Sequence, residues 1–209
     1  MKKIKAIIFD FDGVLCNDYF YQTLKNKKPL LYEQVNSVFK NDKNLIKNWM
    51  RGKIDSLEFN KVLAERFDEE QIFLQTELEI GIKEMQLNKY LLNFASNIQK
   101  EGIKTAVLTD NMDVFQKVMV PTNKLNDYFD EIFSSFDHKR LKLDEGGKMV
   151  KYLIKKLGVN FDDLLVIDDW EKLGEFIKQN KGNFYLFKKG DYKQEFDKFY
   201  LWFKNNFIL

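Results

Sequence analysis

Short apolar runs bounded by polar residues or glycine recur along the chain, and they restrict its possible folds more than any other feature. Runs without polar alternation are typical of strands buried on both faces of a parallel sheet. Segments with apolar residues at three- and four-residue spacing lie between the later runs, as at 149–157 before Gly158. This alternation predicts an α/β fold with a doubly wound, Rossmann-like parallel sheet. The predicted strands are Ile4–Phe9, Ile103–Leu108, Glu131–Ser134, Leu164–Ile167 and Phe184–Phe187.

Roughly ninety residues separate the first two predicted strands, far more than an ordinary connection between a strand and a helix needs. Helical periodicity dominates this segment. After Gly52, for example, one side of a predicted helix carries Leu57, Phe59, Val62, Leu63 and Phe67. We therefore predict that residues 17–90 form an inserted helical cap domain, and that residues 1–16 and 91–209 form the core.

Composition excludes several classes of protein. The 34 basic and 32 acidic residues are intermixed and leave a net charge of +2, so no nucleic-acid-binding surface is indicated. No apolar stretch approaches the roughly 18 residues of a membrane span, and the N-terminus lacks a cleavage signal. We expect a cytoplasmic protein that is a monomer or a weak homodimer and does not bind membranes. A single cysteine allows neither an intrachain disulfide nor a cysteine zinc site.

Acidic and hydroxyl side chains follow three of the predicted strands. Asp10 and Asp12 come directly after the first strand, and Thr109 follows the second. Asp168 and Asp169 follow the fourth. The carboxyl ends of parallel strands share one edge of the sheet, where ligands bind in open α/β folds. Four carboxylates at that edge are costly without a cation, and oxygen ligands of this kind suit Mg²⁺.

Three motifs in order resemble those of the haloacid dehalogenase-like hydrolases. Asp10–Leu15 matches the first family motif, in which two aspartates one residue apart follow the first strand. Ala106–Asn111 resembles the second motif, and Val166–Asp169 resembles the fourth. The segment containing Arg51–Phe59 is similar to the helical C1-type cap of the family. The resemblance extends over nearly the whole chain.

The resemblance implies a reaction in which Asp10 attacks phosphorus to form an aspartyl-phosphate. Asp12 would protonate the leaving oxygen and then activate water. The dehalogenases after which the family is named lack an aspartate at the position of Asp12, which disfavours cleavage of a carbon–halogen bond. A cap over the core suits a small phosphorylated substrate, because it encloses compact ligands and excludes bulk water.

The resemblance also implies the groups that bind the metal and the phosphoryl oxygens. Thr109 and the neighbouring backbone at Asp110 would hold the phosphoryl oxygens. The implied Mg²⁺ ligands are Asp10, the backbone carbonyl of Asp12, and Asp169 with help from Asp168.

The family's third motif, normally a lysine before the helix that precedes the fourth strand, departs from the usual pattern here. The common Lys-Pro pair is absent, and Lys142 stands about where the family has its lysine. We predict that Lys142 is the active-site lysine. Lys148, in or near the first turn of the following helix, is the main alternative, and Lys139 is a weaker one.

Two other functions remain open from the sequence. A sugar phosphomutase uses the same nucleophile, but it returns the phosphoryl group to an intermediate and requires a bisphosphate activator. A non-catalytic binding protein can keep the fold without the reaction. The intact aspartates favour a Mg²⁺-dependent phosphatase.

Overall fold

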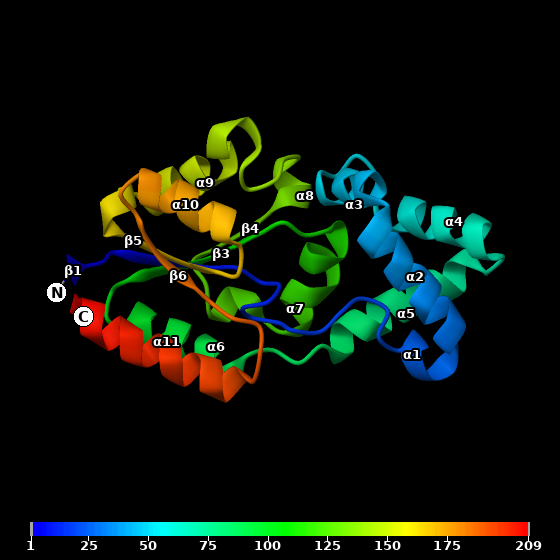
Figure 1. Ribbon diagram of the computed structural model, residues 1–209, viewed down its shortest axis with the longest axis horizontal. Helices are drawn as coiled ribbons and strands as arrows, with labels where there is room; N and C mark the ends of the chain where they lie inside the picture. The colour runs from blue at the N-terminus through cyan, green and yellow to red at the C-terminus, as the bar shows by residue number, and fades with distance from the viewer. Residues whose placement is uncertain (1, 209) are drawn as a thin grey trace.

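The computed structural model describes residues 2–208, and its central feature is a parallel five-stranded sheet with the order β4-β3-β2-β5-β6 (Figure 1). This arrangement is the predicted doubly wound α/β fold, with β2 at the centre. The five strands are β2 (Ala6–Phe9), β3 (Lys104–Thr109), β4 (Glu131–Ser134), β5 (Leu164–Asp168) and β6 (Asn183–Leu186). A separate parallel pair joins the chain ends through β1 (Lys2–Lys3) and β7 (Phe207–Ile208).

Both faces of the sheet are covered by helices, which explains why its strands are continuous apolar runs. Side chains alternate along β2, so Ile7 and Phe9 join one apolar cluster while Ala6 and Ile8 join another. Figure 1 shows α6 and α11 on one face of the sheet and α9 and α10 on the other. These four helices span Lys89–Lys100 (α6), Asp144–Leu157 (α9), Glu171–Gln179 (α10) and Tyr192–Asn206 (α11).

Five helices between β2 and α6 lie beside one end of the sheet, away from its covered faces (Figure 1). They fall within residues 17–90, the segment predicted to form a cap, and we call them the helical insert. The insert consists of α1 (Leu24–Lys27), α2 (Pro29–Asn41), α3 (Lys43–Met50), α4 (Ser56–Phe67) and α5 (Gln71–Glu84). No helix within residues 2–208 combines the length and apolar character needed to cross a membrane.

An aromatic cluster forms the centre of the insert. The rings of Trp49 and Phe59 stack with centroids 4.1 Å apart, and Phe39 packs against both. Within α4, Phe59 and Leu63 are buried as the periodicity predicted, but Leu57 is 52% exposed. The prediction for Leu57 was wrong: Leu57 lies in the first turn of α4, between Asp55 and Glu58 of the capping box, and its side chain is exposed.

Short elements complete the chain between β3 and β5. A π-helical turn at Phe115–Met119 leads into α7 (Val120–Thr122), and α8 (Ser135–His138) follows β4. Turns of 3₁₀ helix lie at Leu125–Asp127 and Phe161–Asp163. The segments that follow β3 and β4 both contact the insert, and several of these contacts are described below.

Candidate active site

The turn after β2 is held in an unusual conformation that brings Asp10 to the edge of the sheet. Asp10 is 6% exposed, and its Oδ1 accepts a hydrogen bond of 2.7 Å from the backbone N–H of Phe11. Gly13 has a φ of 79°, which favours glycine. A side chain at Gly13 would also collide with the carboxylate of Asp169. Glycine is therefore needed here both for the turn and for the close approach of two acidic segments.

Three carboxylates meet at this edge because β2 and β5 are neighbours in the sheet. Asp10, Asp168 and Asp169 each offer an oxygen within 4.8 Å of the others, and together they can hold a metal ion. Burial, followed by the charge of Asp168, raises the pKa of both Asp10 and Asp169. A cation beside these groups would favour their charged forms, and a hard, all-oxygen donor set suits Mg²⁺. The carboxylate of Asp12 lies outside this group, and the role of its backbone carbonyl as a ligand stays a prediction.

Lys142 reaches into the acidic group from the loop before α9. Its Nζ lies 2.8 Å from Oδ1 of Asp10 and 2.7 Å from Oδ2 of Asp168. Burial disfavours the ammonium, but the charges of Asp10 and Asp168 outweigh it and raise the pKa of Lys142 well above its usual range. The ammonium is therefore charged and neutralises part of the acidic group.

The two alternative lysines lie elsewhere. Lys148 is exposed, and its Nζ pairs with Glu145 at 2.9 Å. Lys139 is also exposed, with its Nζ 4.2 Å from the ring centroid of Phe136. Of the three candidates, only Lys142 contacts the carboxylates at the sheet edge.

The start of α9 differs from a regular helix, and the difference separates Lys142 from Lys148. Glu145, Gly146 and Gly147 have φ values of 53°, 66° and 76°, so a left-handed turn precedes the right-handed part of the helix. The regular helix therefore begins at about Lys148. This turn allows the backbone N–H of Lys142 to donate to Oδ1 of Asp110 at 2.8 Å, which fixes the loop against the end of β3.

Asp12 occupies a different environment from Asp10, although only one residue separates them. Its side chain is accessible from a cavity, yet protein surrounds it on the other sides. Burial raises the pKa of Asp12 to about 6, against the opposing charge of Lys142. Asn111 donates from Nδ2 to Oδ2 of Asp12 at 3.0 Å. Asn111 was part of a motif in the sequence, but nothing there indicated that it orients Asp12.

Thr109 ends β3 beside these carboxylates. Its Oγ1 is buried and has no hydrogen-bond partner among residues 2–208. A buried hydroxyl without a partner costs about 1–3 kcal/mol, so a ligand oxygen that pairs with it would bind favourably. Asp110, the other predicted substrate-binding residue, is partly buried and lines the cavity that Asp12 faces.

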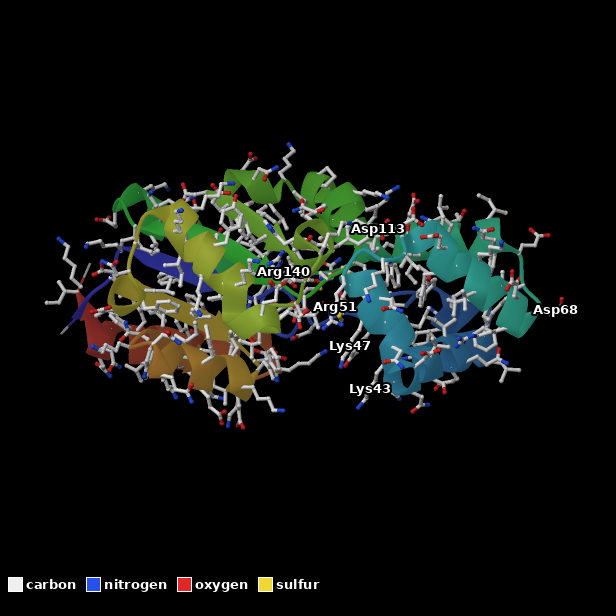
Figure 2. The ribbon with its side chains drawn as sticks, turned by 90° about the horizontal axis from the view of Figure 1, so that it is seen from above. Lys43, Lys47, Arg51, Asp68, Asp113 and Arg140 are labelled. Carbon is white, nitrogen blue, oxygen red and sulfur yellow. The ribbon has the colours of Figure 1, made fainter. Side chains whose placement is uncertain are left out.

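The insert is attached to the active-site loops by buried and partly buried polar contacts. Asp113, in the loop after β3, accepts hydrogen bonds from Nε1 of Trp49 at 2.7 Å and from Oγ of Ser56 at 2.9 Å. Arg51 pairs with Asp144 through two hydrogen bonds of 2.7 and 2.8 Å. Figure 2 shows Arg51 and Asp113 at the junction between the insert and the core. Sequence reasoning missed these residues, since pairs so far apart in the chain leave no local signal.

A cavity of about 590 Å³ lies between the insert and the core. Asp12, Gly13 and Asp110 form its floor, and α2 and α3 supply much of its wall. Cys16 also borders it, but burial raises the pKa of the thiol to about 12, which leaves it protonated at neutral pH. The cavity is of the size that holds a small molecule.

Comparisons with known proteins agree with this geometry. A family model described as haloacid dehalogenase-like hydrolase matches residues 4–174. No curated protein matches the chain by sequence.

Several solved structures share the fold. A HAD family enzyme from Bacteroides thetaiotaomicron, in complex with magnesium and inorganic phosphate, is similar with a TM-score of 0.74 and 20% identity, over 90% of this chain and 96% of that one. A predicted HAD-like hydrolase from Porphyromonas gingivalis is similar with a TM-score of 0.75 and 16% identity, over 95% of this chain and 98% of that one. The L-2-haloacid dehalogenase of Xanthobacter autotrophicus, with chloropropionic acid covalently bound, has a TM-score of 0.62 and 18% identity. The similarity covers 87% of this chain and 76% of that one.

Proposed function

Because the chain belongs to the haloacid dehalogenase-like hydrolase family, we propose that it is a magnesium-dependent phosphatase acting on a small phosphorylated metabolite. The observation that carries the proposal is the contrast between two neighbouring carboxylates. Asp10 is buried beside Lys142, whereas Asp12 faces a cavity and has a pKa of about 6. One group is placed to attack, and the other is placed to exchange protons near neutral pH.

In the proposed reaction a carboxylate oxygen of Asp10 attacks phosphorus, and the bond from phosphorus to the ester oxygen breaks. Protonated Asp12 donates its proton to the departing alkoxide, so an alcohol leaves. Ionised Asp12 then takes a proton from water, whose oxygen attacks phosphorus. Inorganic phosphate is released, and Asp10 returns to a carboxylate.

The surrounding residues lower the electrostatic cost of bringing a phosphate to an aspartate. Lys142 offsets the charge of Asp10, and the unpaired hydroxyl of Thr109 offers a hydrogen bond to a phosphoryl oxygen. Magnesium held by Asp10, Asp168 and Asp169 would add positive charge beside the transferring group. The magnesium and phosphate bound to the similar B. thetaiotaomicron enzyme support this assignment.

Asp12 also distinguishes phosphatase from dehalogenase activity. An alkoxide is a poor leaving group without a proton, whereas a halide departs without one. A carboxyl group with a pKa of about 6, opening onto the cavity, therefore matches an ester substrate better than a halide.

The test is release of inorganic phosphate by the purified protein from a panel of phosphate monoesters that includes an activated aryl phosphate, with and without Mg²⁺. Asp10→Asn is the control for contaminating phosphatases. We expect Mg²⁺-dependent release that the control lacks. No release from any ester would exclude a phosphatase and favour a binding protein, whereas activity only with a bisphosphate activator would indicate a phosphomutase.

A further inference from the structure

The cavity lies on the side of the active site where the leaving alcohol must go. Asp12, the group that would protonate the ester oxygen, is part of its floor, whereas Asp10 and Lys142 are buried behind it. Because attack and departure occur on opposite sides of phosphorus, the alcohol part of the substrate projects past Asp12 into this space. The wall of the cavity therefore selects the alcohol.

Most of that wall is apolar and much of it is aromatic. Its apolar side chains include Phe20, Tyr32, Phe39, Ile46, Met50 and Met85. The rings of Phe20 and Phe39 lie 5.9 Å apart between centroids, and Trp49 packs behind both at 6.2 and 6.4 Å. This support holds the two exposed ring surfaces in place, so the wall is a preformed aromatic surface.

The polar side chains on the wall form two groups. Asp18 and Lys189 come from the loops after β2 and β6. Glu33, Asn36 and Lys40 lie three and four residues apart on α2, which places them along one face of that helix. A polyhydroxylated alcohol presents hydrogen-bonding groups around its whole ring, and those turned toward apolar side chains would lose their water without gaining a partner. An apolar ring placed against those apolar side chains has no hydrogen-bonding groups to leave unpaired.

We propose that the cavity binds the alcohol part of the substrate as a flat aromatic group, so that the natural substrate is the phosphate monoester of an aromatic alcohol rather than of a sugar. This inference rests on the proposed phosphatase function. Aromatic rings pair favourably with Phe20 and Phe39 in stacked or edge-to-face arrangements, and the methionine side chains adapt to a ring edge.

The first experiment compares esters of equal intrinsic reactivity. Benzyl phosphate, cyclohexylmethyl phosphate and glucose 6-phosphate are all esters of primary alcohols that carry a six-membered ring. Their leaving groups are therefore similar, and differences in kcat/KM report on the cavity. We expect benzyl phosphate to exceed glucose 6-phosphate by at least roughly tenfold, the scale on which apolar pockets discriminate. The cyclohexyl ester should lie between them. Equal or higher kcat/KM for glucose 6-phosphate would overturn the proposal.

A variant locates the preference. Phe39→Leu keeps an apolar side chain but removes the ring, and it should raise KM for benzyl phosphate about threefold or more, leaving glucose 6-phosphate unchanged. Leu30→Ala is the matched control, because Leu30 lies on the same helix, is 75% exposed and is absent from the cavity wall. If Phe39→Leu alters both esters equally, the ring does not set specificity. Should Phe39→Leu fail to fold, Phe20→Leu makes the same test.

A binding measurement tests this inference independently of the proposed phosphatase function. 2-Phenylethylphosphonate replaces the ester oxygen of benzyl phosphate with carbon and cannot be hydrolysed at that position. Calorimetric titration of the Mg²⁺-loaded protein with this phosphonate and with methylphosphonate measures the contribution of the ring without turnover. At least roughly tenfold tighter binding of the aromatic phosphonate supports the ligand class even if no ester is hydrolysed. Equal affinities, or no binding of either, would overturn it.

Discussion

Loss of the Asp113 carboxylate should weaken the attachment of the insert more than any other single polar substitution at the junction. Its Oδ1 accepts the indole N–H of Trp49, and its Oδ2 accepts the hydroxyl of Ser56 and the ammonium of Lys117 at 2.8 Å. Trp49 and Ser56 are buried, whereas the Lys117 side chain is 60% exposed. Asp113→Ala therefore leaves two buried donors without an acceptor, while Lys117 returns to water.

The magnitude follows from those three contacts. Each buried donor left unpaired costs about 1–3 kcal/mol, and loss of the exposed Lys117 pair adds less than about 1 kcal/mol. We therefore expect Asp113→Ala to lower the free energy of unfolding by roughly 2–7 kcal/mol. Asp113→Asn keeps one acceptor oxygen and should lower the free energy of unfolding by roughly 1–2 kcal/mol. Lys117→Ala is the control that removes only the exposed partner, and it should cost less than about 1 kcal/mol. Urea unfolding followed by circular dichroism measures all three, and a loss below about 1 kcal/mol for Asp113→Ala would refute the reasoning.

The same contacts predict a dependence on pH. Burial opposes the charge of Asp113, but hydrogen bonds from Lys117, Trp49 and Ser56 hold its pKa below the usual value. A lowered pKa in the folded state means that the stabilisation is complete above the unfolded-state pKa of about 3.9, and is lost as pH falls through the folded-state value. The stability difference between the wild-type protein and Asp113→Asn should therefore be constant near neutrality and shrink below about pH 4.

Further predictions concern the reaction. Asp10→Asn should abolish phosphate release in a protein that remains folded by circular dichroism, whereas Asp12→Asn should slow turnover by about 10²–10⁴-fold. Since Asp12 has a pKa of about 6 and must be protonated to release the alcohol but ionised to activate water, wild-type turnover should fall on both sides of that pH. Lys142→Ala should lower kcat by orders of magnitude and Lys148→Ala by less than twofold or so; the reverse order would move the assignment. A strong chelator should stop turnover and lower the melting temperature, and added Mg²⁺ should restore both. Excess Ca²⁺ should inhibit turnover. Full activity in the presence of the chelator would contradict a role for the metal.

Residues whose positions depend on strand ends were predictable from the sequence. Asp10 and Asp168 terminate or directly follow neighbouring parallel strands, and the register that pairs Phe9 with Ile167 brings the following residues together. The apolar runs that define the strands lie in short windows, so periodicity finds them and the sheet topology then places their ends. Lys142 was predicted from the resemblance to the family's third motif, and the structure brings Lys142 rather than Lys148 to the carboxylates.

Other features depend on contacts that no window contains. The bond from Asn111 to Asp12 joins the loops after β3 and β2, and the bonds to Asp113 join that loop to α3 and α4. The left-handed turn before the regular part of α9 did leave a signal, because the consecutive glycines Gly146 and Gly147 are poor helix formers.

The core and the insert supply different parts of the site, which explains why the type of reaction is easier to predict from the sequence than the substrate. The groups to which we assign the reaction with the phosphoryl group lie at or near strand ends, and the register of the sheet fixes the positions of those ends. Groups that line the alcohol side come from α2, α3 and the segments joining insert and core, and their selection depends on how these elements pack together. A substitution such as Phe39→Leu can change the ring surface without touching Asp10, Asp12 or Lys142. Sequence motifs therefore constrain the chemistry, and only the packed cavity constrains the alcohol on which that chemistry acts.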